Sequence, residues 1–347
     1  MSTEFNPELL RLARQRSGLT ISEVALASGV SARSISAYEN GSSEPDGSRA
    51  REIAGVLGVD SEYFYQDDVE LVQPGAVSFR KLSKTSAKQR DAALASASLA
   101  LSFYALLEER FNLPEADLPD MGNLLPAEAA EQLRYEWLLG DAPVSNMLQL
   151  LESKGVRIAA LGDDFRDIDA FCFSVDRSNF IFVNVGRSAE RQRFDLAHEL
   201  GHLVLHRTCE MDASTSKDRE AQANEFASNF LMPASALLSQ QLLSAGMERI
   251  LAAKKYWGVS AMALVYRLHK LDLLSDWQYR SACTTLARQG YRSGEPDGAN
   301  PEVSRLLRSV MFGGISKVSI RAASAKLRVK PPQIQSLVQG LVPLMVA

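Results

Sequence analysis

The stretch Phe194-Asp195-Leu196-Ala197-His198-Glu199-Leu200-Gly201-His202-Leu203-Val204-Leu205 is the most informative part of this 347-residue chain. Its apolar residues recur at helical spacing, so it predicts a helix with His198 and His202 one turn apart on one face. Two imidazoles at that separation suit a tetrahedral zinc ion. Glu199 lies beside the first of them, where its carboxylate can take a proton from water on the metal. The alternative is a pair of structural histidines on an amphipathic helix.

A zinc site normally needs a third protein ligand, and a helix predicted over 218–233 offers one. Position 208, where a longer histidine motif would supply this ligand, is Thr208, and His206 is interpreted as a helix-end histidine. Glu220 and Asn224 lie four residues apart at the edge of the apolar face of the later helix. We therefore expect Glu220 to bind the metal and Asn224 to orient a ligand histidine by a hydrogen bond.

Residues 1–68 predict a bundle of short helices joined by tight turns. Thr20 and Glu23 form a capping-box pattern at the start of the second helix, and Gly29 separates that helix from the third, as in a helix–turn–helix. The expected helices are Pro7–Arg16, Ile21–Ser28, Ser31 to about Asn40, Glu52–Leu57 and Ser61–Tyr65.

Several segments of this region resemble the Xre family of lambda-repressor-like DNA-binding domains, namely Leu9–Arg14, Gly18–Thr20, Glu23–Ala25, Gly29–Ser31 and Ile35–Gly41. The resemblance covers all 68 residues and implies that the second helix of the pair enters the major groove of an operator. Arg33 would then read a guanine edge. The candidate DNA contacts are Thr20, Ser31, Ala32, Arg33, Ser36, Ala37 and Asn40. The alternative is a bundle that mediates only dimer or partner contacts.

Charge is distributed unevenly along the chain. The whole chain has 38 basic and 42 acidic side chains, a formal charge of -4. Residues 1–68 contain six basic and eleven acidic side chains, whereas residues 301–347 contain seven basic and one acidic. Because phosphate neutralisation supplies much of the affinity for DNA, we expect weak or dimerisation-dependent binding by the N-terminal bundle. The opposite charges also predict contact between the two ends, within one chain or across a dimer.

The middle of the chain predicts a helical linker over 77–125, with one long helix at 87–111, and then a domain over 126–290. That domain is expected to begin with helices at 127–139 and 144–154 and to continue through strands at 156–161, 170–175 and 180–185. Helices follow from Ser188. The strand at 180–185 directly precedes the His198 helix, so we expect it to hold an extended substrate by edge pairing.

A basic helical subdomain is predicted over 295–347, and its pattern at 318–338 resembles a helix–turn–helix. Two interpretations stay open for it. It is either a solvated basic face on a capping subdomain or a docking surface for nucleic acid or an acidic partner.

The combined pattern of Arg191–His202 and Glu220–Pro233 resembles the ImmA/IrrE family of metallopeptidases, with further likeness at Trp137, 150–152 and 169–171. The resemblance places the metal ligands at His198, His202 and Glu220 and the catalytic glutamate at Glu199. It implies a minimal gluzincin-like zincin with one Zn²⁺ per chain. Such an enzyme cleaves a protein partner, typically an Xre-type repressor, in stress or mobile-element control.

Fusions of an Xre module to this domain also resemble antitoxins encoded beside a toxin. A non-catalytic repressor or antitoxin that binds a partner or toxin through the zincin fold therefore stays open as the alternative function.

The predicted fold class is mainly α with a small β-sheet (α+β): a lambda-repressor-like bundle, a minimal zincin domain and a small helical C-terminal unit. The chain has no apolar run of about 18 uncharged residues, and Cys172, Cys209 and Cys283 form no CxxC pair, so we expect a cytoplasmic protein without a membrane partner. The expected partners are double-stranded operator DNA, a protein substrate such as an Xre-type repressor or a cognate toxin, single-stranded nucleic acid as a signal, and a second copy in a homodimer.

Overall fold

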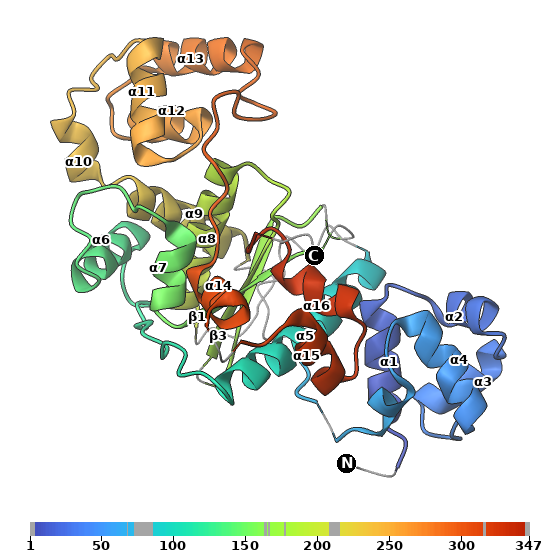
Figure 1. The fold of residues 1–347 in the computed structure, drawn as a ribbon. Helices are drawn as coiled ribbons and strands as arrows, with labels where there is room; N and C mark the ends of the chain where they lie inside the picture. Colours follow the sequence, from blue (N-terminus) through green and yellow to red (C-terminus); the bar gives the residue numbers. More distant parts are fainter. Residues whose placement is uncertain are drawn as a thin grey trace. The chain divides into compact units, whose positions relative to one another are not determined.

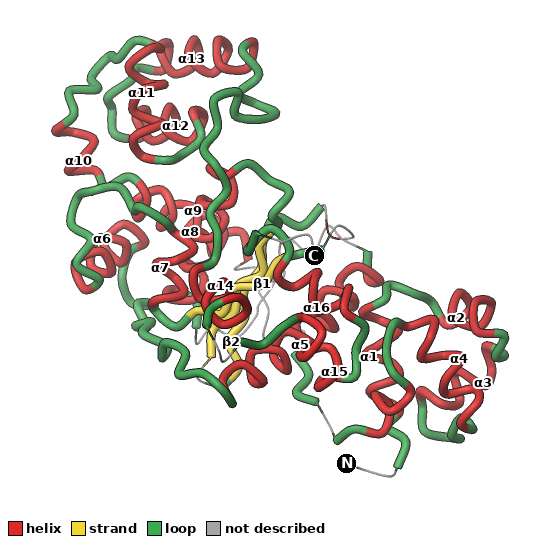
Figure 2. Tube along the Cα trace, viewed as in Figure 1, coloured by secondary structure: helices red, strands yellow, loops and turns green. Residues whose placement is uncertain are grey.

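The computed structural model describes residues 4–67, 69–72, 86–162, 165, 167–176, 178–207, 216–314 and 317–343. The chain divides into two compact units. The first unit comprises residues 1–113, 159–168 and 305–347, and the second comprises 114–158 and 169–304. Helices dominate the described chain and strands form one small sheet, as the sequence predicts (Figure 2).

The first unit begins with the predicted helix–turn–helix bundle. Its helices are α1 (Pro7–Arg16), α2 (Ile21–Ser28), α3 (Ala32–Glu39), α4 (Gly47–Leu57) and the 3₁₀ helix η1 (Ser61–Tyr65). Thr20 and Ser31 cap α2 and α3, and Gly29 between them takes a left-handed φ of 71°. The fourth helix begins earlier than predicted, because the Asp46 side chain accepts the backbone N–H groups of Ser48 and Arg49.

Among its described residues the first unit has four further helices: α5 (Ala87–Glu108), α14 (Arg305–Phe312), α15 (Ile320–Leu327) and α16 (Pro331–Val338). The long helix α5 packs against α1 and α15 (Figure 1). By length and composition α5 is a candidate membrane span, but 67% of its apolar window is buried inside the protein, as in the core helix of a folded domain. The predicted contact between the two ends of the chain is present within this unit, where Val59 and Val329 form an antiparallel β-bridge.

The second unit contains α6 (Pro126–Glu136), α7 (Met147–Ser153), α8 (Ala189–Leu205), α9 (Ser216–Leu231), α10 (Ala234–Ser239), α11 (Met247–Trp257), α12 (Ala261–Lys270) and α13 (Asp276–Arg288). The helix α7 begins later than predicted, because Asn146 caps it by accepting the backbone N–H of Gln149 at 2.8 Å. The helices α6 and α8 both pack against α9, so α9 lies at the centre of this helical layer.

The sheet has three strands, β1 (Val156–Ala160), β2 (Ala170–Val175) and β3 (Ser178–Val183), in the order β1-β3-β2. β2 and β3 form an antiparallel hairpin in which Ala170 faces Val183 and Val175 faces Ser178. The prediction that the strand at 180–185 offers a free edge to substrate is wrong. β3 lies between two strands, so both of its edges are already paired.

Candidate metal centre

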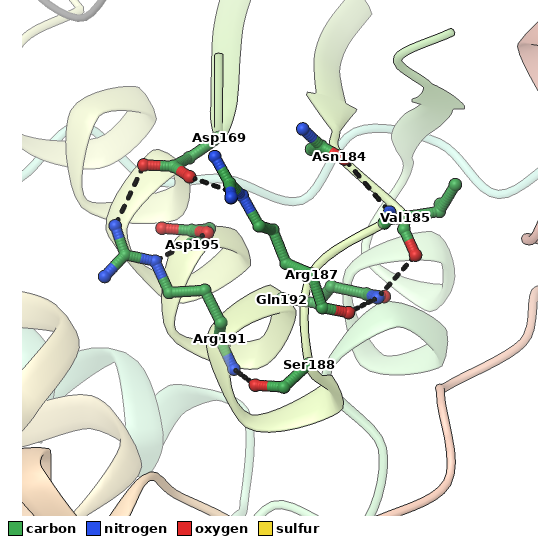
Figure 3. Close-up of polar contacts among 9 residues, drawn as sticks. Asp169, Asn184, Val185, Arg187, Ser188, Arg191, Gln192 and Asp195 are labelled. Atoms are coloured by element: carbon green, nitrogen blue, oxygen red, sulfur yellow. Dashed lines mark hydrogen bonds and ion pairs between the residues drawn. The ribbon is translucent and has the colours of Figure 1, made fainter. Parts of the chain in front are cut away.

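The turn from β3 into α8 fixes the start of the helix that carries His198. Ser188 caps this helix by accepting the backbone N–H of Arg191 at 3.3 Å. The Gln192 amide donates to the carbonyl oxygens of Val185 at 3.1 Å and Arg187 at 2.8 Å, as Figure 3 shows. These bonds hold the loop against the first turn of the helix.

A group of charged side chains joins the same helix to the beginning of β2. The Asp169 carboxylate lies 3.0 Å from Arg187 Nε and 2.9 Å from Arg191 Nη2, and Arg191 Nε lies 3.2 Å from the buried Asp195 (Figure 3). Asp169 immediately precedes β2, so the sheet and α8 are linked by ion pairs as well as by apolar packing. Arg191 and Asp195 of the sequence pattern therefore have structural roles.

The structure brings His198, His202 and Glu220 together, with one possible ligand atom from each residue within 4.8 Å of the others. The two Nε2 atoms are 3.1 Å apart. Glu220 places one carboxylate oxygen 3.3 Å from His202 Nε2 and the other 3.6 Å from His198 Nε2. Nitrogen and oxygen ligands bound tetrahedrally to zinc at about 2.1 Å would be about 3.3–3.4 Å apart. Both the donor set and its spacing therefore fit a zinc ion.

A close approach of α8 and α9 makes this convergence possible. A Cβ atom built on Gly201 would lie 3.0 Å from Phe226 Cδ1 and 3.3 Å from the Cα of Ala223. Phe226 and Ala223 are fully buried. Glycine at position 201 therefore lets α9 lie near enough for Glu220 to reach the two histidines.

Hydrogen bonds behind the site orient both imidazoles. Asn224 Oδ1 lies 3.0 Å from His198 Nδ1, on the far side of the ring from Glu220. An amide oxygen can only accept, so His198 carries its proton on Nδ1 and turns the Nε2 lone pair toward the possible metal position.

A longer hydrogen-bond chain orients the second imidazole. His206 Nε2 lies 2.8 Å from Gln222 Oε1, and His206 Nδ1 lies 3.0 Å from His202 Nδ1. Burial lowers the pKa of His206 to about 4, so its ring is neutral at pH 7. Donation from His206 to Gln222 leaves His206 Nδ1 as an acceptor. His202 therefore donates from Nδ1 and keeps the Nε2 lone pair for a metal.

The sequence did not reveal this role for His206. His206 lies at the end of α8, as predicted, and is the C-cap residue of this helix. Its ring also contacts His202 and Gln222. The four-residue spacing from His202 to His206 is the one feature of the sequence that indicates a contact between these two rings. The contact of His206 with Gln222 depends on how α8 and α9 pack, which the sequence does not specify. Thr208 and Cys209 lie outside the described residues.

Glu199 follows His198 on α8 and is 2% exposed, within the buried layer between the sheet and α9. An ionisable side chain in such a position, one residue from a ligand histidine, is suited to proton transfer at a bound metal.

The candidate DNA contacts lie at the start of α2 and along α3. Six of these seven residues are exposed, namely Thr20, Ser31, Ala32, Arg33, Ser36 and Asn40, and Ala37 is partly exposed. In contrast, Glu39 is buried, and Arg14 binds both of its carboxylate oxygens, at 2.6 and 2.8 Å. The bundle thus holds α3 by an internal ion pair while the outer side of this helix stays open to a partner.

These features define a helix–turn–helix protein that also carries a metallopeptidase-type domain. Family models agree: residues 10–64 match the helix–turn–helix model, and residues 151–269 match the IrrE N-terminal-like domain model. The chain is therefore an Xre-like helix–turn–helix fused to an ImmA/IrrE-type peptidase-family domain, as the resemblance predicted. A search of curated proteins finds no match to the chain.

Proposed function

We propose that the chain is a cytoplasmic DNA-binding regulator whose second unit hydrolyses peptide bonds of a protein partner with the help of one zinc ion. The observation that carries this proposal is the convergence of His198, His202 and Glu220 beside Glu199. When bound, zinc would supply a Lewis acid that polarises a carbonyl oxygen and makes water more acidic.

The residues of the chain have distinct roles in this proposal. His198, His202 and Glu220 would hold the metal, and Asn224 would keep His198 in its ligand tautomer. The Glu199 carboxylate would take a proton from the attacking water and pass it to the departing amine. Because this proton returns to the product, Glu199 is ready for the next turnover.

An extended substrate would need an open strand edge, and β3 has none. We place the substrate along β2, which is an edge strand of the described sheet and packs against α8. Edge pairing recognises backbone rather than sequence, so specificity would come from docking elsewhere on the partner. An Xre-type repressor or a cognate toxin encoded beside this chain is the proposed partner.

The test compares wild type with Glu199→Gln, each purified with zinc and incubated with every protein encoded in the neighbouring operon, with and without DNA. We expect wild type to cleave one of these proteins and Glu199→Gln to leave it intact while retaining its metal. If both proteins leave every candidate intact, the peptidase proposal is overturned.

The Xre-type module also suits a repressor or antitoxin that uses the zincin fold only as a binding scaffold. This alternative predicts that Glu199→Gln complements a deletion of the gene fully, whereas Arg33→Ala does not. Loss of complementation by Glu199→Gln, with the protein folded and metal-loaded, would exclude it.

A further inference from the structure

The C-terminal part of the first unit reproduces the spacing of the helix–turn–helix α2–α3. Both pairs consist of two eight-residue helices, Ile21–Ser28 with Ala32–Glu39 and Ile320–Leu327 with Pro331–Val338. The first residue after the leading helix is left-handed in each pair, with φ of 71° at Gly29 and 57° at Arg328. The next residue is a buried valine in each, Val30 and Val329.

The match extends to the capping and core positions. Ser319 caps α15 by accepting the backbone N–H of Ala322, as Thr20 caps α2. Ile334 is fully buried at the position in α16 that Ile35 occupies in α3. Agreement in helix length, left-handed turn, buried valine and core isoleucine indicates a second helix–turn–helix rather than two unrelated helices.

The turn of this second motif docks on the turn between α4 and η1. The backbone N–H of Asp60 donates to Arg328 O and that of Lys330 donates to Gly58 O, each at 2.9 Å. Lys330 Nζ also lies 2.8 Å from Asp60 Oδ1. The start of α16 is thereby packed against the N-terminal bundle.

The outer side of α15 remains exposed. Arg321, Ala322, Ala325 and Lys326 are all exposed, so two cations flank two small side chains on one face. The alanines leave room for a close approach by a large ligand, and the cations are suited to an anionic one. The segment 305–347 contains no acidic residue that could repel such a ligand.

Four cations of the described C-terminal segment are also available, unlike most of the cations in the N-terminal bundle. Five of the six basic side chains in residues 1–68 already bond within the bundle: Arg11, Arg14, Arg16, Arg49 and Arg51. Among the described residues, Arg308, Lys317, Arg321 and Lys326 form no hydrogen bond or ion pair through their side chains. The acidic bundle therefore has few free cations, and the adjoining segment supplies them.

We propose that α15 contacts the phosphate backbone of double-stranded DNA through Arg321 and Lys326, so that a second helix–turn–helix extends the surface of α2–α3. This proposal rests on DNA binding by the N-terminal motif. In such motifs the leading helix crosses the backbone. α16 begins with Pro331 and Pro332 where α3 has Ala32 and Arg33, so it offers no side chain there for base edges. The contact is thus independent of sequence.

The test uses the full chain and the double variant Arg321→Gln/Lys326→Gln. Arg280→Gln/Arg288→Gln is the matched control, because it removes two exposed arginines on α13 whose side chains form no hydrogen bond or ion pair among the described residues. Fluorescence anisotropy would follow binding to a labelled duplex from upstream of the gene, to one separated strand of that duplex and to a scrambled duplex across a range of salt concentrations. Circular dichroism would check that all variants are folded.

We expect the double variant to lose affinity for both duplexes by the same factor, on the order of tenfold or more. The plot of log association constant against log salt concentration has a negative slope, and we expect the magnitude of this slope to decrease by roughly two. The control should match wild type. An unchanged slope and affinity, an equal loss in the control, or tighter wild-type binding to the single strand than to the duplex would each overturn the proposal.

Failure of the claim that the N-terminal motif binds DNA would give a different result from failure of the α15 proposal. If Arg33→Ala abolishes the preference for the upstream duplex while the double variant binds like wild type, only the α15 proposal is overturned. If wild type binds neither duplex, DNA binding by the N-terminal motif is overturned together with it.

Discussion

Asn224 is the residue whose role can be tested most cleanly, because its side chain contacts a ligand histidine from behind. Asn224→Leu removes the acceptor 3.0 Å from His198 Nδ1 and frees the ring to turn or change tautomer. We expect zinc affinity, measured by competition with a chromophoric chelator, to fall roughly 10–100-fold. Asn224→Asp retains an acceptor and should keep most of the affinity.

The neighbouring Glu225 gives the control for this substitution. It is exposed on the same helix, so Glu225→Gln should bind zinc like wild type. If Asn224→Leu also binds zinc like wild type, the orienting role of Asn224 is wrong.

At this scale the sequence could predict the residues that depend on helical spacing, but not those that depend on tertiary contact. The four-residue spacing of His198 and His202 puts them on one face of α8, and the same spacing puts Glu220 and Asn224 on one face of α9. The bond between His206 and Gln222 joins the end of α8 to α9 and requires the two helices to be placed in space.

At the scale of elements, the packing of α8 against α9 decides whether Glu220 reaches the histidines. Gly201→Ala would gain about 1 kcal/mol of helix propensity. Its Cβ, however, would overlap Phe226 and crowd the backbone at Ala223, which costs about 1–3 kcal/mol. We therefore expect no gain in thermal stability, and a weaker zinc affinity because α9 is displaced.

A matched control for this prediction is Gly55→Ala in α4. A Cβ atom at Gly55 would meet nothing within 4 Å, so the same substitution should raise stability by about 1 kcal/mol there. Equal stabilisation by both substitutions, with unchanged zinc affinity for Gly201→Ala, would contradict this prediction. It would show that an added methyl group at position 201 does not push α8 and α9 apart.

The positions of the strands could be predicted from the sequence, but their order in the sheet could not. Val, Ile and Phe content located all three strands to within about two residues, since each is a short apolar run bounded by turns. Their order could not be predicted from such runs, because pairing is set by contacts across the sheet. The strand expected to bind substrate therefore lies at the centre of the sheet rather than at an edge.

At the scale of the whole molecule, the unequal charges of the two ends have a structural counterpart. The basic segment 305–347 belongs to the same compact unit as the acidic helix–turn–helix bundle, whereas the residues just before it, 295–304, belong to the second unit. Segregation of charge was visible in the sequence. The pairing of the turns at 58–60 and 328–330 was not, because it joins backbone groups about 270 residues apart.

The central claim is that the second unit holds one zinc ion through two helices, and metal content per chain tests it most directly. Wild type, Glu199→Gln and the double variant His198→Ala/His202→Ala would be expressed with zinc, dialysed and measured by inductively coupled plasma mass spectrometry. We predict one zinc per chain in wild type and in Glu199→Gln, and almost none in the double variant. Wild type without zinc, or a double variant that retains it fully, would contradict the claim.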